Sequence, residues 1–258
     1  MEFAMNLRES LWLCRALLNS PQHKTRTLLK RFYLLRRFAK YILPEYRFKW
    51  PQLDWWEDGE FNQYLARFRE LDGNNTDRRY AVAELLRLVG AVQGDTAEVG
   101  AYEGAMSWLI CKANAGARMH HIFDSFEGLS QPSPVDGSHW SKGALACGED
   151  VVRQNLSEFA GHFSTYKGWV PARFPDVAHR RFSFVHIDVD LYQPTRDSIE
   201  FFYPRMNPGG VIVCDDHGFS SCRGATKACD DFLADKPEKF VGLSAGAGFF
   251  IKGVETAP

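Results

Sequence analysis

The pattern of apolar and polar positions changes at about residue 96. From there onward, short apolar runs alternate with stretches in which apolar residues recur every three or four positions. Short apolar runs bounded by turn residues indicate buried strands, and the three-to-four spacing indicates amphipathic helices. The pattern predicts strands over 96–100, 121–124, 163–167, 182–188 and 210–215, and helices over 106–114, 149–159, 194–203 and 225–234.

Strands that alternate with helices form a mainly parallel sheet with helices on both faces. The C-terminal segments 240–243 and 248–252 flank a turn that contains Gly246, and Gly248 follows it directly, which indicates an antiparallel hairpin at or near one edge of that sheet. We therefore expect an α/β, Rossmann-like fold whose sheet is mostly parallel.

The first 75 residues have another pattern and another charge. Apolar residues at 28, 32, 35, 38 and 42 give one helical face, and Pro44 ends that pattern. Residues 1–50 contain eleven Lys and Arg but three Asp and Glu, whereas the whole chain has a net charge of −1. We expect residues 1–75 to form a basic helical extension. The main domain, residues 76–258, then begins with a helix over 77–88 capped near Asn75 or Thr76.

Composition argues against several classes of protein. The chain has no run of the roughly 20 apolar residues that a membrane helix needs, and its start does not read as a signal peptide. Six cysteines at irregular spacing, without a CxxC pair, argue against a zinc site or a redox motif and favour buried thiols. We expect a reduced, cytoplasmic protein. The acidic balance of the main domain argues against nucleic-acid binding.

A glycine turn follows the first predicted strand. In the sequence from Ala97 to Gly104, Gly100 allows a tight turn and a close approach of the backbone to a ligand. Tyr102 stands where a dinucleotide-binding fingerprint has its second glycine, so a NAD-dependent oxidoreductase is disfavoured. A ligand without phosphates, such as S-adenosylmethionine (SAM), suits this turn better. A plain strand-to-helix turn is the alternative interpretation.

An acidic residue, Asp124, ends the second predicted strand about 24 residues after the glycine turn. At that place in a doubly wound sheet, a carboxylate can accept hydrogen bonds from both ribose hydroxyls. Ser125 and Phe126 would then lie beside the adenosine. We expect the cofactor to be bound by Glu98, Gly100, Tyr102, Ser107, Asp124 and Ser125.

Three further acids, Asp188, Asp215 and Asp216, lie at the ends of two later strands. The carboxyl ends of parallel strands meet at the edge where such sheets bind ligands. Carboxylates brought together there repel one another unless a cation lies between them. Oxygen ligands select a hard ion, so we expect these three residues to bind Mg²⁺, for which Mn²⁺ or Ca²⁺ can substitute.

Several segments together resemble one family, the TylF/macrocin O-methyltransferases. They are EVGAYEG, IFDSFEGL, YKGWVP, FVHIDVDLYQPT, FFYPRMNPGG, CDDHGF and GATKA, and the resemblance covers about residues 76–255. It implies a class I SAM-dependent methyltransferase fold with a seven-stranded sheet. It also implies Mg²⁺ at the three aspartates, Asp190 as general base, and sugar hydroxyls on natural products as substrates. The chain departs from the family at His217, usually a tyrosine, and at Ala144, commonly an acid.

The expected reaction moves the SAM methyl group to a weakly acidic sugar hydroxyl, which Mg²⁺ would orient and stabilise as it loses its proton. Asp190 would take the proton, or would instead have a capping or supporting role. Among the histidines, His139 and His217 compete with Asp190 for the base role. His186, inside a strand, is typical of a satisfied core residue, and we expect no metal role for His120 or His121.

Alternatives stay open for the acceptor and for the basic extension. The acceptor could be a lipid-linked or cell-surface glycan or a catechol-like diol, and a SAM-binding protein without turnover is an alternative from another class. The extension could be a helix docked on the domain or on a dimer partner, a lid over the acceptor helped by residues 46–56, or a contact with an anionic membrane surface. We expect a glycosylated small-molecule partner and a homo-oligomer.

Overall fold

The computed structural model describes residues 15, 34–35, 38–39, 58–70 and 75–256. The chain divides into two compact units, residues 1–64 and 65–258. In the first unit the described residues are helical at 15, 34–35 and 38–39, and helix α3 (Gly59–Arg67) begins there. The rest of the predicted basic helix and the aromatic segment 46–56 lie outside the described residues. The predicted domain boundary between residues 75 and 76 stays a prediction.

A seven-stranded sheet forms the centre of the second unit, in the order β3-β2-β1-β4-β5-β7-β6. Neighbours among the first five strands are parallel, whereas β7 runs antiparallel to both β5 and β6. The strands are β1 (Asp95–Val99), β2 (His120–Asp124), β3 (Phe163–Lys167), β4 (Phe182–Ile187), β5 (Met206–Cys214), β6 (Val241–Gly242) and β7 (Gly248–Ile251). The mostly parallel sheet and its antiparallel C-terminal hairpin are therefore confirmed.

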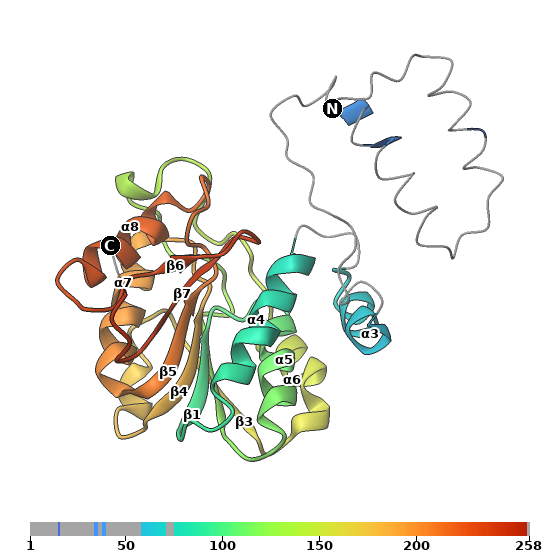
Figure 1. Ribbon diagram of the computed structural model, residues 1–258, viewed down its shortest axis with the longest axis horizontal. Coiled ribbons are helices and arrows are strands. Elements are labelled where there is room, and N and C mark those ends of the chain that lie inside the picture. The colour runs from blue at the N-terminus through green and yellow to red at the C-terminus, as the bar shows by residue number, and fades with distance from the viewer. Residues whose placement is uncertain (1–14, 16–33, 36–37, 40–57, 71–74, 257–258) are drawn as a thin grey trace. The chain divides into compact units, whose positions relative to one another are not determined.

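Helices cover both faces of this sheet (Figure 1). On one face lie α4 (Thr76–Leu88), α5 (Ala105–Asn114) and α6 (Glu149–Asn155), and on the other lie α7 (Tyr192–Phe202) and α8 (Arg223–Leu233). Short 3₁₀ turns complete the unit: η2 (Pro134–Asp136), η3 (Ser157–Phe159), η4 (Phe174–Val177) and η5 (Tyr203–Arg205).

The central strands are buried and mostly apolar because helices cover both of their faces. Every residue of β4 is buried, and so are the last four residues of β1. The core between the sheet and helices α7 and α8 contains Phe123, Phe174, Phe182 and Phe202, which meet mainly edge to face. These rings fix the sheet rigidly beneath the loops that follow its strands.

Three elements differ most from the sequence prediction, and the bounds of most others shift by one or two residues. Strand β5 begins four residues earlier than predicted and runs through Pro208 and Gly209, because its edge pairs with the chain end: Gly209 N donates to the Lys252 carbonyl over 2.8 Å. Strand β6 has two residues. Helix α6 ends at Asn155, and a separate 3₁₀ turn follows it.

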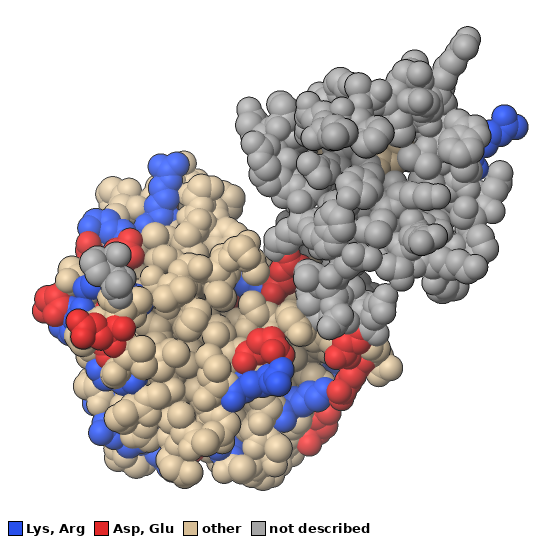
Figure 2. Space-filling view, viewed as in Figure 1, with Lys and Arg blue, Asp and Glu red and all other residues tan. Residues whose placement is uncertain are grey.

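The surface of the second unit carries both signs of charge. On the face shown in Figure 2, basic and acidic side chains are interspersed over residues 65–258. Several are neighbours one helical turn apart, such as Arg153 with Glu149 and Lys227 with Asp231. Among the described residues, no helix is long and apolar enough to cross a membrane.

Candidate functional site

The carboxyl ends of four neighbouring strands meet at one edge of the sheet. In the register, Val99 of β1 lies beside Phe123 of β2 and Ile187 of β4, and Ile187 lies beside Cys214 of β5. The next residue of each chain segment is therefore brought to the same edge. This topology collects Gly100, Asp124, Asp188 and Asp215 there.

Gly100 is the point where the backbones that follow β1 and β4 touch. Its φ is +85°, and a Cβ at this position would lie 1.8 Å from the carbonyl oxygen of Asp188. A side chain has no room there, and the left-handed backbone also favours glycine. Tyr102, two residues later, also has a positive φ of 50°, and half of its surface is exposed. The sequence predicted that the backbone at this turn approaches a ligand, whereas the contact that the structure shows is with the backbone of Asp188.

Asp124 holds the glycine turn through its carboxylate. Its Oδ2 accepts hydrogen bonds from the backbone N–H groups of Ala101 (2.7 Å) and Tyr102 (3.2 Å), and its Oδ1 accepts one from Phe126 (2.7 Å). The Ser125 hydroxyl donates to the carbonyl of Gly128 over 2.7 Å. Both side chains thus shape the loops around an open cavity of about 820 Å³, here called the donor cavity.

The donor cavity lies along the ends of β1, β2, β3 and β4. Its lining includes Gly100, Tyr102, Asp124, Ser125, Trp169, Asp188 and Asp190. It has apolar walls and a few polar groups, which is the usual character of a small-molecule site. Four of the six predicted cofactor residues lie on this wall.

Glu98 and Ser107, the other two predicted cofactor residues, belong to a buried network behind the wall. The Ser107 hydroxyl donates to Glu98, and His120 Nε2 lies 3.2 Å from the same hydroxyl. Ser107 has no exposed surface and lines neither cavity at this edge, whereas Glu98 reaches the second cavity described below. The geometry gives Ser107 a supporting position beneath the site rather than a place on its surface.

His186 joins this network to the acid cluster. Its Nδ1 lies 3.3 Å from Glu98 Oε1, and its Nε2 lies 3.2 Å from Asp215 Oδ1. Burial lowers the pKa of the imidazole, but the two flanking carboxylates outweigh burial and raise the pKa to about 10. His186 is therefore a core residue, as its place in a strand predicted, and it is also a buried cation.

Asp215 is bound by two cationic side chains. Besides the His186 contact, its Oδ2 lies 2.9 Å from Arg78 Nη1, and Arg78 also donates to the Asp215 carbonyl over 3.3 Å. Burial raises the pKa of Asp215, but the His186 hydrogen bond and the Arg78 charge outweigh it and hold the pKa below its usual value. Arg78 comes from helix α4, and no sequence pattern pointed to it.

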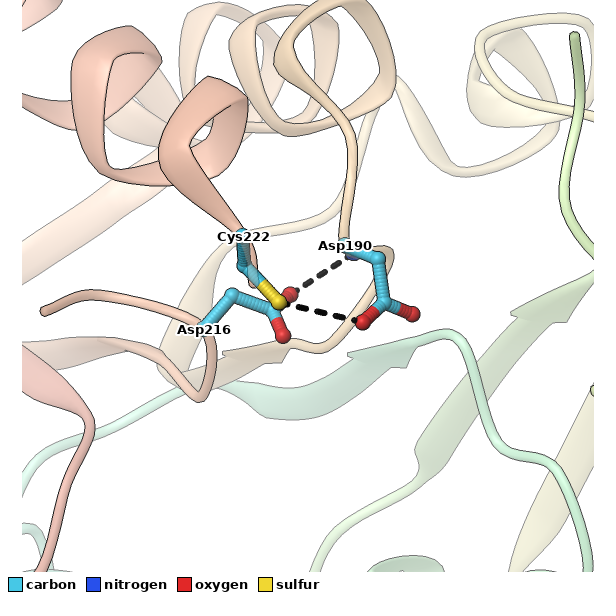
Figure 3. A group of neighbouring side chains, drawn as sticks. All are labelled: Asp190, Asp216 and Cys222. Carbon is cyan, nitrogen blue, oxygen red and sulfur yellow. Dashed lines mark hydrogen bonds between the residues drawn. The ribbon is translucent and has the colours of Figure 1, made fainter. Parts of the chain in front are cut away.

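Asp216 and Asp190 form a second part of the acid cluster (Figure 3). Asp216 Oδ2 accepts the N–H groups of Val189 (3.1 Å) and Asp190 (2.7 Å), and the Cys222 thiol donates to Asp190 Oδ1 over 3.4 Å. Asp190 has a φ of 60°. This left-handed backbone conformation turns the chain, just past the strand, back toward the strand edge. Burial and the charge of Asp188 raise the pKa of Asp190 to about 7.

Asp188 differs from its neighbours because its carboxylate receives no hydrogen bond from any described residue. Burial and the charges of Asp215 and Asp216 raise its pKa well above the usual value. Burial and the charges of Asp190 and Asp215 likewise raise the pKa of Asp216. Hard oxygen donors that repel one another and lack enough cationic partners suit a divalent cation.

The carboxylate oxygens of the predicted metal triad, Asp188, Asp215 and Asp216, do not lie as close together as the ligands of a bound metal ion do. Among the described residues, Asp190, Asp216 and Cys222 each place one potential ligand atom within 4.8 Å of the others, whereas Asp188, Asp215 and Asp216 form no such group. Both oxygens of Asp215 are engaged by Arg78 and His186. Burial raises the pKa of the Cys222 thiol well above its usual value, so the thiol stays protonated and does not suit a hard cation. The triad stays a prediction that its donor chemistry supports.

A second cavity of about 1260 Å³, the acceptor cavity, adjoins the donor cavity. The two cavities share Gly100, Tyr102, Leu145, Asp188 and Asp190. The acceptor cavity is also lined by Arg78, His139, Trp140, Asp216, Phe219 and Cys222. His139 thus lies on the wall of this cavity. His217 does not line it, since the ring stacks on Phe240 at 5.1 Å and its Nε2 lies 3.4 Å from Asp230.

Comparison with known proteins agrees with this geometry. Residues 78–237 match the family described as macrocin-O-methyltransferase (TylF). The chain is 30% identical over 152 residues to the 8-demethyl-8-(2,3-dimethoxy-alpha-L-rhamnosyl)-tetracenomycin-C 4'-O-methyltransferase of Streptomyces olivaceus, covering 54% of this chain and 58% of that protein. It is 28% identical over 152 residues to the mycinamicin III 3''-O-methyltransferase of Micromonospora griseorubida, covering 52% and 59%. The chain thus spans less than two thirds of the length of these relatives.

Solved structures show the same fold. The O-methyltransferase NovP superposes with a TM-score of 0.59 at 22% identity, covering 69% of this chain and 80% of that one. The calicheamicin methyltransferase CalS11 also gives 0.59, at 17% identity, covering 98% and 95%. The predicted class I methyltransferase fold is therefore confirmed. With residues 78–237 matched over more than half of its length, the chain belongs to the macrocin O-methyltransferase (TylF) family.

Proposed function

We propose that this protein transfers the methyl group of SAM to a hydroxyl of a sugar in a glycosylated small molecule. One observation carries the proposal: two cavities meet at Asp188 and Asp190, at the carboxyl edge of the sheet. A transferase needs donor and acceptor sites that open onto a common point, so that the methyl group and the attacking oxygen can come into line. The relatives whose names state a rhamnosyl or mycinamicin acceptor support the sugar as substrate class.

The donor cavity would hold SAM. The Asp124 carboxylate, which lines this cavity together with Ser125 and Trp169, would bind the ribose. The glycine turn brings bare backbone to the cavity, and Tyr102 lies where the donor and acceptor cavities join. Glu98 and Ser107 would support this turn from beneath through their shared hydrogen bond. SAM already carries a reactive methyl group, so these residues need to bind and orient the donor more than to activate it.

Asp190 would take the proton from the acceptor hydroxyl. It lines both cavities, and a carboxylate with a pKa of about 7 accepts a proton far better than an ordinary aspartate. The backbone bond to Asp216 and the thiol bond from Cys222 hold Asp190 in place. His139 lines the acceptor cavity but lies outside this bonded group.

Asp188, Asp215 and Asp216 would hold Mg²⁺, which when bound would stabilise negative charge on the attacking oxygen. The chain's own contribution is to keep these carboxylates at one edge despite their repulsion. Arg78 and His186 do so for Asp215, and two backbone N–H groups do so for Asp216.

A methyl-transfer screen tests the proposed function. SAM and Mg²⁺ would be supplied with a panel of glycosides, sugar nucleotides and catechols, and products would be detected by a mass increase of one methylene group. We expect methylated glycosides, and transfer to catechols alone would contradict the sugar substrate. Separately, SAM or its demethylated product should raise the melting temperature of the protein. The absence of any such shift at saturation would exclude SAM as the donor.

A further inference from the structure

Asp136 is a buried acid that the reaction outlined above does not use. It lies in the loop between β2 and α6, residues 130–148, here called the acceptor loop because it carries His139 and Trp140 on the wall of the acceptor cavity. Only 5% of the Asp136 surface is exposed. A buried carboxylate costs stability unless hydrogen bonds compensate its lost hydration, so its partners indicate what it holds.

Asp136 first closes the acceptor loop on itself. Its Oδ2 accepts hydrogen bonds from both the backbone N–H and the hydroxyl of Ser133, each over 2.7 Å. The Ser133 hydroxyl and the backbone of the 3₁₀ turn form a capping box with Asp136. This half of the carboxylate fixes the conformation of the loop four residues before Trp140.

The other oxygen of Asp136 binds helix α7. Oδ1 accepts the backbone N–H of Tyr192 over 2.6 Å. Tyr192 is the first residue of α7, and the residue before it, Leu191, makes no side-chain cap. Asp136 therefore accepts a hydrogen bond from one of the backbone N–H groups that the first turn of a helix leaves without a partner, although it lies in a distant loop. Its negative charge is also favourable at the positive end of the helix dipole.

Helix α8 packs directly on the same oxygen. A Cβ at Gly224 would lie 1.9 Å from Asp136 Oδ1 and 2.9 Å from Tyr192 N. The helix approaches this closely only because residue 224 has no side chain. Asp136 thus touches α7 two residues after Asp190, and α8 two residues after Cys222, and those two residues are themselves bonded.

We propose that Asp136 is a positioning residue that fixes the acceptor loop relative to the Asp190–Cys222 pair. Its three hydrogen bonds and the Gly224 contact set the distance between the wall that carries Trp140 and the acid that faces the acceptor. The kinetic part of this proposal rests on the proposed methyl transfer, whereas the structural part does not.

The test compares Asp136→Asn with the wild type and with Asp235→Asn as matched control. Asp235 is an exposed acid that follows the C-terminal end of α8, and it pairs with Lys236. Replacing one Asp136 oxygen by an amide turns one acceptor into a donor that faces other donors. Ser133→Ala, which removes one of the three hydrogen bonds, serves as a milder variant and carries the test if Asp136→Asn does not fold.

Trypsin reports the structural part without any substrate. Lys142, in the acceptor loop, is the sole Lys or Arg between Arg118 and Arg153, so one new pair of fragments marks opening of the loop. We expect cleavage at Lys142 to become about tenfold faster in Asp136→Asn, as the loss of a charge-assisted hydrogen bond implies, and to be unchanged in Asp235→Asn. Equal cleavage rates in wild type and Asp136→Asn would overturn the anchoring role.

Kinetics report the functional part. With an acceptor found in the screen, we expect Asp136→Asn to raise KM for the acceptor and lower kcat, while the dissociation constant for SAM stays within twofold of the wild-type value. Faster cleavage with unchanged acceptor kinetics would overturn the link to the acceptor. If the wild type methylates no acceptor, the proposed function fails, and the cleavage experiment still decides whether Asp136 anchors the loop.

Discussion

Glu238 and Asp190 are almost equally buried carboxylates with opposite surroundings. Glu238, with no exposed surface, is met by the Gly253 N–H, the Tyr203 hydroxyl and the Lys252 ammonium group, all within 3.1 Å. Burial raises its pKa, but these donors outweigh burial and lower the pKa to about 2. Asp190, 6% exposed, faces other carboxylates, and its pKa rises to about 7.

The difference separates a structural acid from one to which we assign a function only as a proposal. At Glu238 three donors meet the two carboxylate oxygens that burial removes from water, and two of these donors come from the chain just after β7. Around Asp190 and Asp188 the donors are too few, and the fold keeps a local excess of negative charge. A fold tolerates such an excess where a ligand or a proton is to be received.

The largest expected effect concerns the proposed role of Asp190 as general base. Asp190→Asn should lower kcat about 10³-fold, within the range typical of a lost general base, because the amide cannot take the proton. SAM binding should survive, since the amide keeps the size of the side chain. Single-turnover methyl transfer and SAM titration would measure the two effects. An unchanged kcat would transfer the base role to another group, with His139 the next residue to replace.

The next effect concerns Glu238. Glu238→Gln should lower the free energy of unfolding by about 3 kcal/mol, because it leaves the Lys252 ammonium group without its counter-ion. Urea denaturation would measure the loss. Glu149→Gln, in an exposed pair with Arg153, is the control and should cost less than about 1 kcal/mol. Similar losses of unfolding free energy in both variants would mean that the buried Glu238 pair contributes no more to stability than the Glu149 pair does.

Asp188→Asn should have the opposite sign. In metal-free protein it should raise the free energy of unfolding by about 2 kcal/mol, because it removes one of several repelling charges. Mg²⁺ should stabilise the wild type against heat and should stabilise this variant much less. Melting curves with EDTA and with Mg²⁺ would decide. If Mg²⁺ does not change the melting temperature of the wild type, the proposed metal site is wrong.

The smallest effect is the acid sensitivity that Glu238 confers. Its folded pKa of about 2 lies below the ordinary value of about 4.3, so its contribution is present above pH 4.3 and is lost as the pH falls toward 2. Between pH 5 and pH 3 the wild type should lose about 1.5 kcal/mol more stability than Glu238→Gln. Urea denaturation at both pH values would show it, and parallel losses in the two proteins would contradict the assignment.

The sequence predicted the sheet and the strand-end residues well because both depend on local pattern. Runs such as Phe182–Ile187 are buried throughout and mostly apolar, and the acids that end such runs reach the ligand edge in any parallel sheet. It failed where contacts join distant segments. Arg78 contacts Asp215, 137 positions later in the chain, and Asp136 contacts Tyr192, 56 positions later. No local sequence motif predicts either contact.

Ser107 also shows that a sequence pattern does not determine which distant residue a side chain contacts. Its place after the glycine turn suggested a cofactor contact, but the helix that begins at Ala105 turns the hydroxyl inward to Glu98. The side-chain cap expected at Asn75 is also absent, since Asn75 accepts a hydrogen bond from Arg78 instead. Both residues were placed in the right element, and their partners depended on tertiary packing.

The missing side chain at Gly100 has a consequence for how this protein can change in evolution. Because the turn after β1 rests directly on the Asp188 carbonyl, a substitution there displaces the proposed donor site and the proposed metal site together. Variants selected for a new acceptor should therefore accumulate changes in the acceptor loop and spare residue 100. In a library in which every position is randomised, residue 100 should tolerate glycine alone, whichever acceptor is used for selection.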